Sequence, residues 1–262
     1  MSGQRIFLLA KRYIIARFFK IEDFIDFVFW PLLDIIIWGG AGAAMASRQG
    51  DGNAMAATVT SVVFMRIFLY AYFNNATNFL YEMMARNIIN LFSTPASFRE
   101  WLCGAMVSGA FSTAMLVLFA TLVAWAIFGI NLLSAGFPLF IFIVPLAVCG
   151  WALAHVTIAV LIHFGVHAQR LAWVLGWLFI PFSGVYYSLA IMPQWIQVIS
   201  RIVPMSYLFT ALRAYLLEGH LAWSVIGCGY LLSVLYFIVG TLAAKIMFER
   251  ARRNGLASLE RS

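Results

Sequence analysis

Residues 81–101, YEMMARNIINLFSTPASFREW, form a long polar interruption in a strongly apolar chain. In their first half, apolar side chains recur at a spacing that places them on one face of a helix, at Met84, Ile88 and Leu91. Glu82 and Arg86 stand four residues apart with the acid first, which favours an ion pair along a helix. The pattern predicts a short helix over residues 82–91.

The second half of this stretch predicts where that helix ends and the next one begins. Ser93, Thr94 and Pro95 disfavour continuation of the first helix. Ser97 with Glu100 three residues later has the pattern of a capping box, which starts a new helix. Two interpretations of this ordered surface segment stay open. It is either a contact surface for a partner outside the membrane or an interfacial helix that rests on lipid headgroups.

The composition is that of an integral membrane protein. Hydrophobic residues make up 64% of the 262 positions and charged residues only 10%, which excludes an ordinary soluble domain. The formal net charge is +7, but the cations stand at the ends of apolar runs, where they face lipid headgroups, so nucleic acid is not an expected partner. The 3 cysteines lie inside apolar runs, which predicts neither a disulfide framework nor a thiolate metal site.

Six apolar stretches are each long enough to cross about 30 Å of hydrocarbon, which predicts an all-α membrane protein with six transmembrane helices. We expect these spans at residues 24–46, 59–80, 102–128, 137–163, 171–191 and 223–244. Residues 4–20 have a basic amphipathic pattern, which predicts an interfacial helix on the cytoplasmic leaflet. Residues 192–222 are apolar, but Pro193 and Pro204 divide them into short pieces, which predicts re-entrant helices on the outer side.

The distribution of cations orients the predicted spans. Thirteen of the 17 Lys and Arg residues lie in residues 4–20, in residues 81–101, in the loop around Arg170 and in the C-terminal tail. Because cytoplasmic loops carry an excess of cations, both termini and residues 81–101 are expected in the cytoplasm. Termini on one side require an even number of crossings, which agrees with six spans.

The sequence lacks the motifs of an enzyme that would act by itself. Its lysines, Lys11, Lys20 and Lys245, do not follow a glycine, which excludes a phosphate-binding loop of the Walker type. His163 and His167 stand four residues apart, but no third ligand is near, so a metal site is not expected. We therefore expect no cofactor, no metal and no bond chemistry on this chain.

Two charged residues within the predicted spans are expected to meet. Asp34 lies about 15 Å into the first span, and Arg66 lies about 10 Å into the second span from its opposite end, so both are near mid-depth. An unpaired charge is costly at that depth. We therefore predict an ion pair that either steadies the first two spans or lines a transport path.

Further polar residues within the spans are candidates for the same path. Asn74 and Asn78 stand late in the second span, where their amides either line a path or bond one helix to another. Tyr186 and Tyr187 stand late in the fifth predicted span and are further candidates to line the path, although membrane aromatics are common at lipid and headgroup surfaces.

Two stretches resemble the ABC-2 type permeases. Residues 85–104, ARNIINLFSTPASFREWLCG, are similar to the coupling segment of that family. Residues 181–213, PFSGVYYSLAIMPQWIQVISRIVPMSYLFTALR, are similar to its block around the fifth span and the outer re-entrant helices. The order of the predicted spans also agrees with the family's layout, so the resemblance covers most of a single domain over residues 1–262.

The resemblance implies a division of labour between chains. Two copies would form the path, and a separate ATP-binding cassette ATPase dimer would bind ATP and engage residues 81–101, which agrees with the missing Walker motif. The residues expected to couple the two are Glu82, Arg86, Asn87, Asn90 and Leu91. The complex would export a lipid, a drug-like molecule or another amphiphile across a bacterial cytoplasmic (inner) membrane, and a lipid-linked polysaccharide is the alternative substrate.

Two other classes of membrane protein fit the sequence less well than a permease. A secondary transporter or channel built from repeats would have paired broken spans, whereas only the region before the last span is broken here. A membrane-embedded enzyme acting on lipids would need clustered histidines or carboxylates, whereas the 4 histidines are scattered along the chain.

Overall fold

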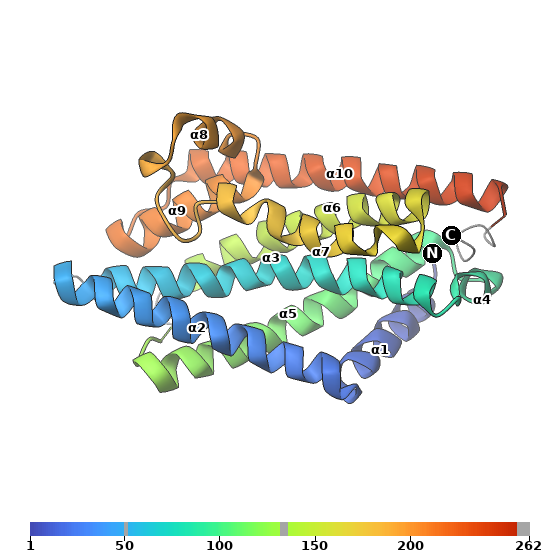
Figure 1. Cartoon of the computed structure of the whole chain (residues 1–262), viewed down its shortest axis with the longest axis horizontal. Helices are drawn as coiled ribbons and strands as arrows, with labels where there is room; N and C mark the ends of the chain where they lie inside the picture. The colour runs from blue at the N-terminus through green and yellow to red at the C-terminus, as the bar shows by residue number, and fades with distance from the viewer. Residues whose placement is uncertain (50–51, 132–135, 256–262) are drawn as a thin grey trace.

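The computed structural model describes residues 1–49, 52–131 and 136–255, and every regular element in this part of the chain is a helix. Five helices are long and apolar enough to cross a membrane, and they run side by side along the long axis (Figure 1). They are α2 (Ile21–Gln49), α3 (Gly52–Met84), α5 (Phe98–Phe128), α6 (Phe140–Phe164) and α10 (Trp223–Arg253). The chain is therefore a multi-pass membrane protein.

Helix α3 forms the centre of the bundle. Within its apolar window 83% of the residues are buried, against 28% or less for α2, α5 and α10. Helix α3 packs on α2, α5 and α6, and α6 in turn packs on α10. Small residues permit the closest approaches, since a Cβ on Gly150 would collide with the Phe68 carbonyl oxygen and one on Gly240 with that of Ala152.

The two ends of the bundle differ. The N-terminus, the end of α10 and α4 (Ile88–Ser93) lie at one end, and α8 (Gln194–Ser200) and α9 (Pro204–Glu218) lie at the other (Figure 1). Helix α1 (Gly3–Phe19) begins at the first end and packs on α5 and α2. The start of α1 and the end of α10 thus lie at the same end of the bundle. Part of the connection between α2 and α3 lies outside the described residues.

The prediction of a continuous fifth span over residues 171–191 is wrong. Helix α7 (Gln169–Leu178) has only 10 residues and is followed by short 3₁₀ helices at Ile180–Phe182 and Leu189–Ile191. The cause is local, because Pro181 lacks a backbone N–H and Gly184 adopts a left-handed φ of 71°.

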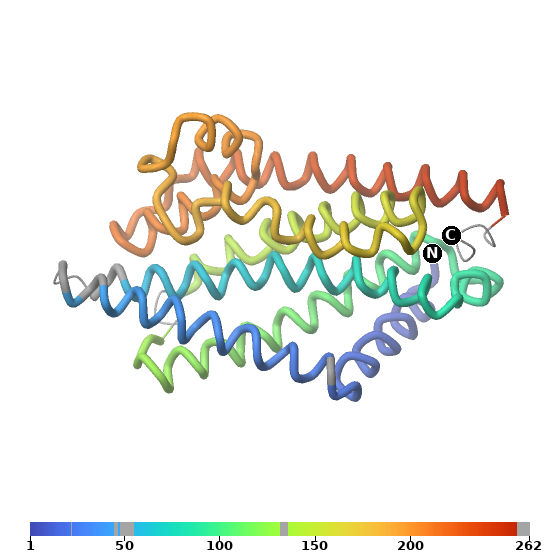
Figure 2. The backbone as a smooth tube through the Cα atoms, in the orientation of Figure 1, coloured from blue at the N-terminus to red at the C-terminus, as the bar shows by residue number. Residues whose placement is uncertain are grey.

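The chain between α6 and α10 nevertheless passes from one end of the bundle to the other (Figure 2). Helices α8 and α9 then meet at an angle of 101°, close to the start of α10. The break at the two prolines is confirmed. That this pair dips into the membrane and returns on the outer side stays a prediction.

Accessibility of single cysteines tests the orientation. In a chain whose three native cysteines are replaced by serine, Asn90→Cys places a thiol on α4 and Glu218→Cys places one at the end of α9, both at exposed positions. A membrane-impermeant maleimide added to intact cells should label Glu218→Cys at once and Asn90→Cys only after permeabilisation. Labelling of both thiols from the same side would contradict the topology, and the cysteine-free parent measures background.

Candidate functional site

The polar stretch at the chain-end side of the bundle contains two helices in place of the single helix predicted over residues 82–91. Helix α3 continues to Met84, the chain turns, and α4 begins at Ile88. Arg86 adopts a left-handed φ of 51°, its N–H donates to the Met83 carbonyl at 2.9 Å, and the Asn87 N–H donates to the Glu82 carbonyl at 2.9 Å. These bonds are those of a Schellman motif, which ends a helix. The motif usually has glycine where this chain has arginine, so no local pattern in the sequence indicates it.

The predicted ion pair of Glu82 with Arg86 is also wrong, because Glu82 turns toward α1. Its carboxylate lies 2.7 Å from the Arg12 guanidinium and accepts hydrogen bonds from the Tyr13 hydroxyl at 2.9 Å and from the Asn87 amide at 2.5 Å. Glu82 is only 4% exposed, so these three donors replace the water that the carboxylate loses.

Tyr13 extends this contact to a third helix. Its oxygen accepts a hydrogen bond from the Trp101 indole N–H at 2.6 Å, so α5, α1 and α3 are joined in one buried network. Burial and then the charge of Glu82 raise the pKa of Tyr13, so its hydroxyl stays protonated and able to donate. Sequence reasoning did not single out Tyr13 or Trp101, since no local pattern joins residues so far apart in the chain.

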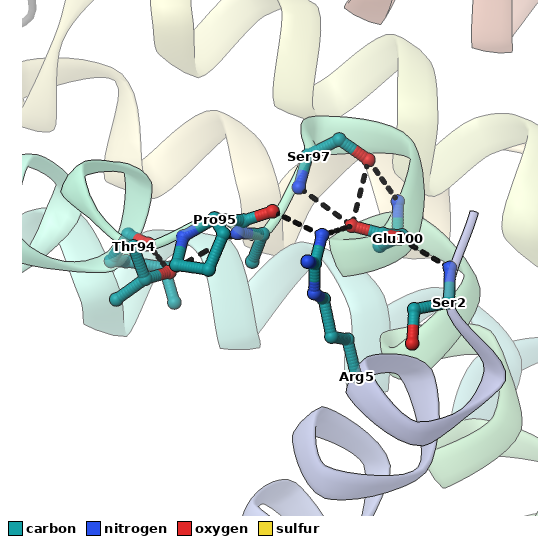
Figure 3. Close-up of polar contacts among 8 residues, drawn as sticks. Ser2, Arg5, Thr94, Pro95, Ser97 and Glu100 are labelled. Carbon is teal, nitrogen blue, oxygen red and sulfur yellow. Dashed lines mark hydrogen bonds and ion pairs between the residues drawn. The ribbon is translucent and has the colours of Figure 1, made fainter.

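A second carboxylate, Glu100, lies in the first turn of α5, after the loop that follows α4 (Figure 3). The predicted capping box is confirmed, with Glu100 accepting from the Ser97 N–H at 2.9 Å and donating its own N–H to the Ser97 hydroxyl at 3.3 Å. The other carboxylate oxygen accepts from the Ser2 N–H at 2.6 Å. Arg5 lies 3.7 Å from Glu100 and donates to the Pro95 carbonyl at 2.6 Å, so α1 also holds the loop after α4.

Helix α4 is thereby held at both ends, through Asn87 before it and Pro95 after it. Its inner face buries Ile88 and Leu91. Phe92, the next residue after Leu91, packs against Phe248 of α10 with ring centroids 4.6 Å apart. On the outer side of the helix Asn90 and Ser93 are exposed, as is Arg86 in the turn before α4, and we call these three residues the α4 surface.

The predicted coupling residues divide accordingly. Arg86 and Asn90 lie on the α4 surface, Glu82 and Leu91 face inward, and Asn87 is half-buried and joins the two groups through its bond to Glu82.

Asp34 and Arg66 form the predicted pair. The Arg66 Nε–H donates to Asp34 Oδ2 at 2.5 Å, a terminal nitrogen donates to the Trp30 carbonyl at 3.2 Å, and the guanidinium lies 5.8 Å from the ring centre of Trp177. Arg66 is 4% exposed, so a carboxylate, a carbonyl and an aromatic face together take the place of its water. The pair joins α2 to α3 and brings α7 against them.

The other path candidates separate in space. Asn74 lies in the contact of α3 with α5, 3.5 Å from the Ser112 hydroxyl, and accepts a hydrogen bond from Asn78 at 3.0 Å. Tyr186 stacks on Trp38 of α2 with ring centroids 3.9 Å apart. Tyr187 donates to the Pro181 carbonyl at 2.7 Å. The structure therefore groups Tyr186 with α2, whereas Asn74 faces α5.

The fold is that of a multi-pass membrane protein with a short ordered helix, α4, at one end of the bundle. The chain matches the family described as ABC-2 type transporter over residues 4–217, from α1 to α9. It therefore belongs to that family, whose members form the membrane component of ABC transporters, are not themselves catalytic and work with ATP-binding cassette subunits. Comparison with curated proteins finds no match.

Replacing Glu82 by glutamine tests the buried network. Glutamine is neutral, so it loses the ion pair to Arg12. It also has one acceptor oxygen where glutamate has two, so one of the donors that face Glu82 is left unpaired. We expect a loss of about 1–3 kcal/mol in stability, seen as a lower melting temperature of the detergent-purified protein. Glu249→Gln, which removes an exposed carboxylate paired with Lys245, serves as the matched control and should change little. Equal melting temperatures for both variants would contradict the role given to Glu82.

A charge-reversal cycle tests the pair within the membrane. Asp34→Arg and Arg66→Asp should each lower the amount of inserted protein, because each leaves two like charges facing one another at depth. The double variant should recover much of it, as measured by quantitative blotting of membranes. A double variant as poor as the worse single one would show that the two residues do not act as partners.

Proposed function

We propose that this chain is the permease subunit of an ATP-driven exporter in a bacterial cytoplasmic membrane. Two copies form the path, separate ATPase subunits bind ATP, and both termini and α4 lie in the cytoplasm. The substrate is a lipid, a drug-like molecule or another amphiphile. Membership of the ABC-2 family supports the general class, and the observation that carries the proposal is the fixed position of α4.

The geometry of α4 suits a surface that receives force. A partner that displaces α4 pushes against Glu82 at the end of α3 and Glu100 at the start of α5, and both carboxylates also bond to α1. Because the two carboxylates are buried and their contacts are charge-assisted, breaking these contacts is costly, and the three helices are expected to move with α4. An interfacial helix that merely rested on headgroups would need no such buried connections.

The exposed residues of this region are the ones expected to meet the ATPase. Arg86 and Asn90 are exposed, and the Asn90 amide is linked to the buried network by one 3.5 Å hydrogen bond to Asn87. Replacing Arg86 or Asn90 therefore leaves the contacts of Glu82 with Arg12 and Tyr13 in place. The basic end of α10, with Arg252 and Arg253 exposed, lies at the same end of the bundle.

Reconstitution of the chain with its partner ATP-binding cassette ATPase tests the proposal. Arg86→Glu and Asn90→Arg should leave membrane levels near those of the parent but abolish copurification of the ATPase and stimulation of its ATP hydrolysis by amphiphiles. Arg201→Glu makes the same charge change at an exposed position of the opposite end and should leave both intact. Full stimulation in Arg86→Glu and in Asn90→Arg would contradict the assignment of the α4 surface.

A further inference from the structure

Two adjoining cavities lie where α1, α2, α3 and α7 meet. The first, which we call the α2–α7 groove, has a volume of about 260 Å³ and is lined by residues of all four helices. The second, of about 390 Å³, lies between α1 and the end of α3. Both are lined by Arg17, Asp23 and Tyr81, so they meet at these residues.

The walls of the groove are mainly apolar. Three tryptophans contribute to its walls, Trp30 from α2 and Trp173 and Trp177 from α7. Arg66 ends it near mid-depth, where it bonds to Asp34. Along α3 the lining runs from Arg66 to Tyr81, about 22 Å at the rise of an α-helix, which is more than the roughly 15 Å of one hydrocarbon leaflet. The groove therefore extends from headgroup level to the middle of the membrane.

The linings of the two cavities carry charges of both signs. Three of the charged lining residues are paired, Arg12 with Glu82, and Arg66 with Asp34 outside the lining. The remaining four are two cations and two carboxylates, Arg17, Lys20, Asp23 and Asp26. Among the residues that the structure describes, none of these four has an ion pair, although Lys20 lies 5.9 Å from the ring centre of Tyr81.

We propose that these cavities bind a zwitterionic phospholipid whose headgroup carries an ammonium group and a phosphate. The phosphate faces Arg17 and Lys20, the ammonium faces Asp23 and Asp26, and an acyl chain lies against the tryptophans of the groove. The inference rests on the proposed function for its orientation, which opens the groove toward the cytoplasmic leaflet.

The balance of charge selects this headgroup over its alternatives. An anionic lipid without an ammonium group would bring its phosphate near two carboxylates with nothing to offset their repulsion. A cationic amphiphile would bring its charge near two unpaired cations. Only a headgroup with both signs satisfies all four side chains, and the aromatic walls suit an apolar chain or an ammonium group that reaches a ring.

Native mass spectrometry of the purified full-length chain, released from a non-ionic detergent, tests the proposal without any ATPase. The probes are phosphatidylethanolamine, phosphatidylglycerol and a trimethylammonium lipid with identical acyl chains, which are zwitterionic, anionic and cationic. We expect phosphatidylethanolamine to bind most tightly. Asp26→Asn should weaken its binding and that of the cationic lipid by roughly fivefold, and Arg17→Gln should weaken its binding and that of the anionic lipid by a similar factor.

Matched variants make the outcome decisive. Lys11→Gln on α1 removes an exposed charge and Glu249→Gln on α10 removes a partly exposed one. Neither residue lines a cavity, so both variants should leave all three affinities unchanged. Tighter binding of phosphatidylglycerol, no effect of Asp26→Asn, or equal effects of Lys11→Gln and Arg17→Gln would each overturn the proposal. Because no ATPase is present, such a result leaves the assigned α4 surface standing, whereas loss of ATPase coupling would leave the lipid affinities unchanged.

Discussion

The buried carboxylate of Glu82 sets the arrangement of the whole cytoplasmic-facing end that we propose for this permease. A carboxylate that is 4% exposed must recover from protein groups what it loses from water, and its donors come from α1 and from the residue that precedes α4. Meeting that demand fixes where α1 lies against α3 and how the chain turns after α3. Glu100 at the start of α5 likewise needs hydrogen-bond donors from the protein. The contacts of these two carboxylates, one before α4 and one after it, therefore position this short helix.

Helix α3 satisfies a second demand of the same kind at mid-membrane. Arg66 lies 16 residues before Glu82 on this helix and is equally buried, and it recovers its lost hydration from Asp34, a carbonyl of α2 and the ring of Trp177. These contacts hold α2 and α7 on the same helix at one depth. The groove between them therefore depends on the pairing, because Arg66 lines its deep end and its walls include the two helices that Arg66 brings together.

The features that could be predicted from the sequence are those with a local cause. The capping box of Ser97 and Glu100 needs only a spacing of three, and five spans follow from length and apolarity. The pairing of Asp34 with Arg66 was predictable because depth can be counted along helices from a common surface. The break after Glu82 was missed because the left-handed position is held by Arg86 and not by glycine. The broken fifth span does carry local signs, Pro181 and Gly184, that the apolar pattern outweighs.

The partners of Glu82 were beyond local reasoning, and they matter most for how the proposed permease would work. Arg12 and Arg17 stand on one helix about 7.5 Å apart along its axis, the first bonded to Glu82 beside the α4 surface and the second at the mouth of the groove. A displacement of α4 that is carried through Glu82 to α1 would change the separation of Arg17 from Asp23 and Asp26. Because linkage is reciprocal, a headgroup that bridges these charges would in turn bias the position of α4. Helix α1 would then connect what the groove holds to what the ATPase senses, a role that its amphipathic sequence alone does not indicate.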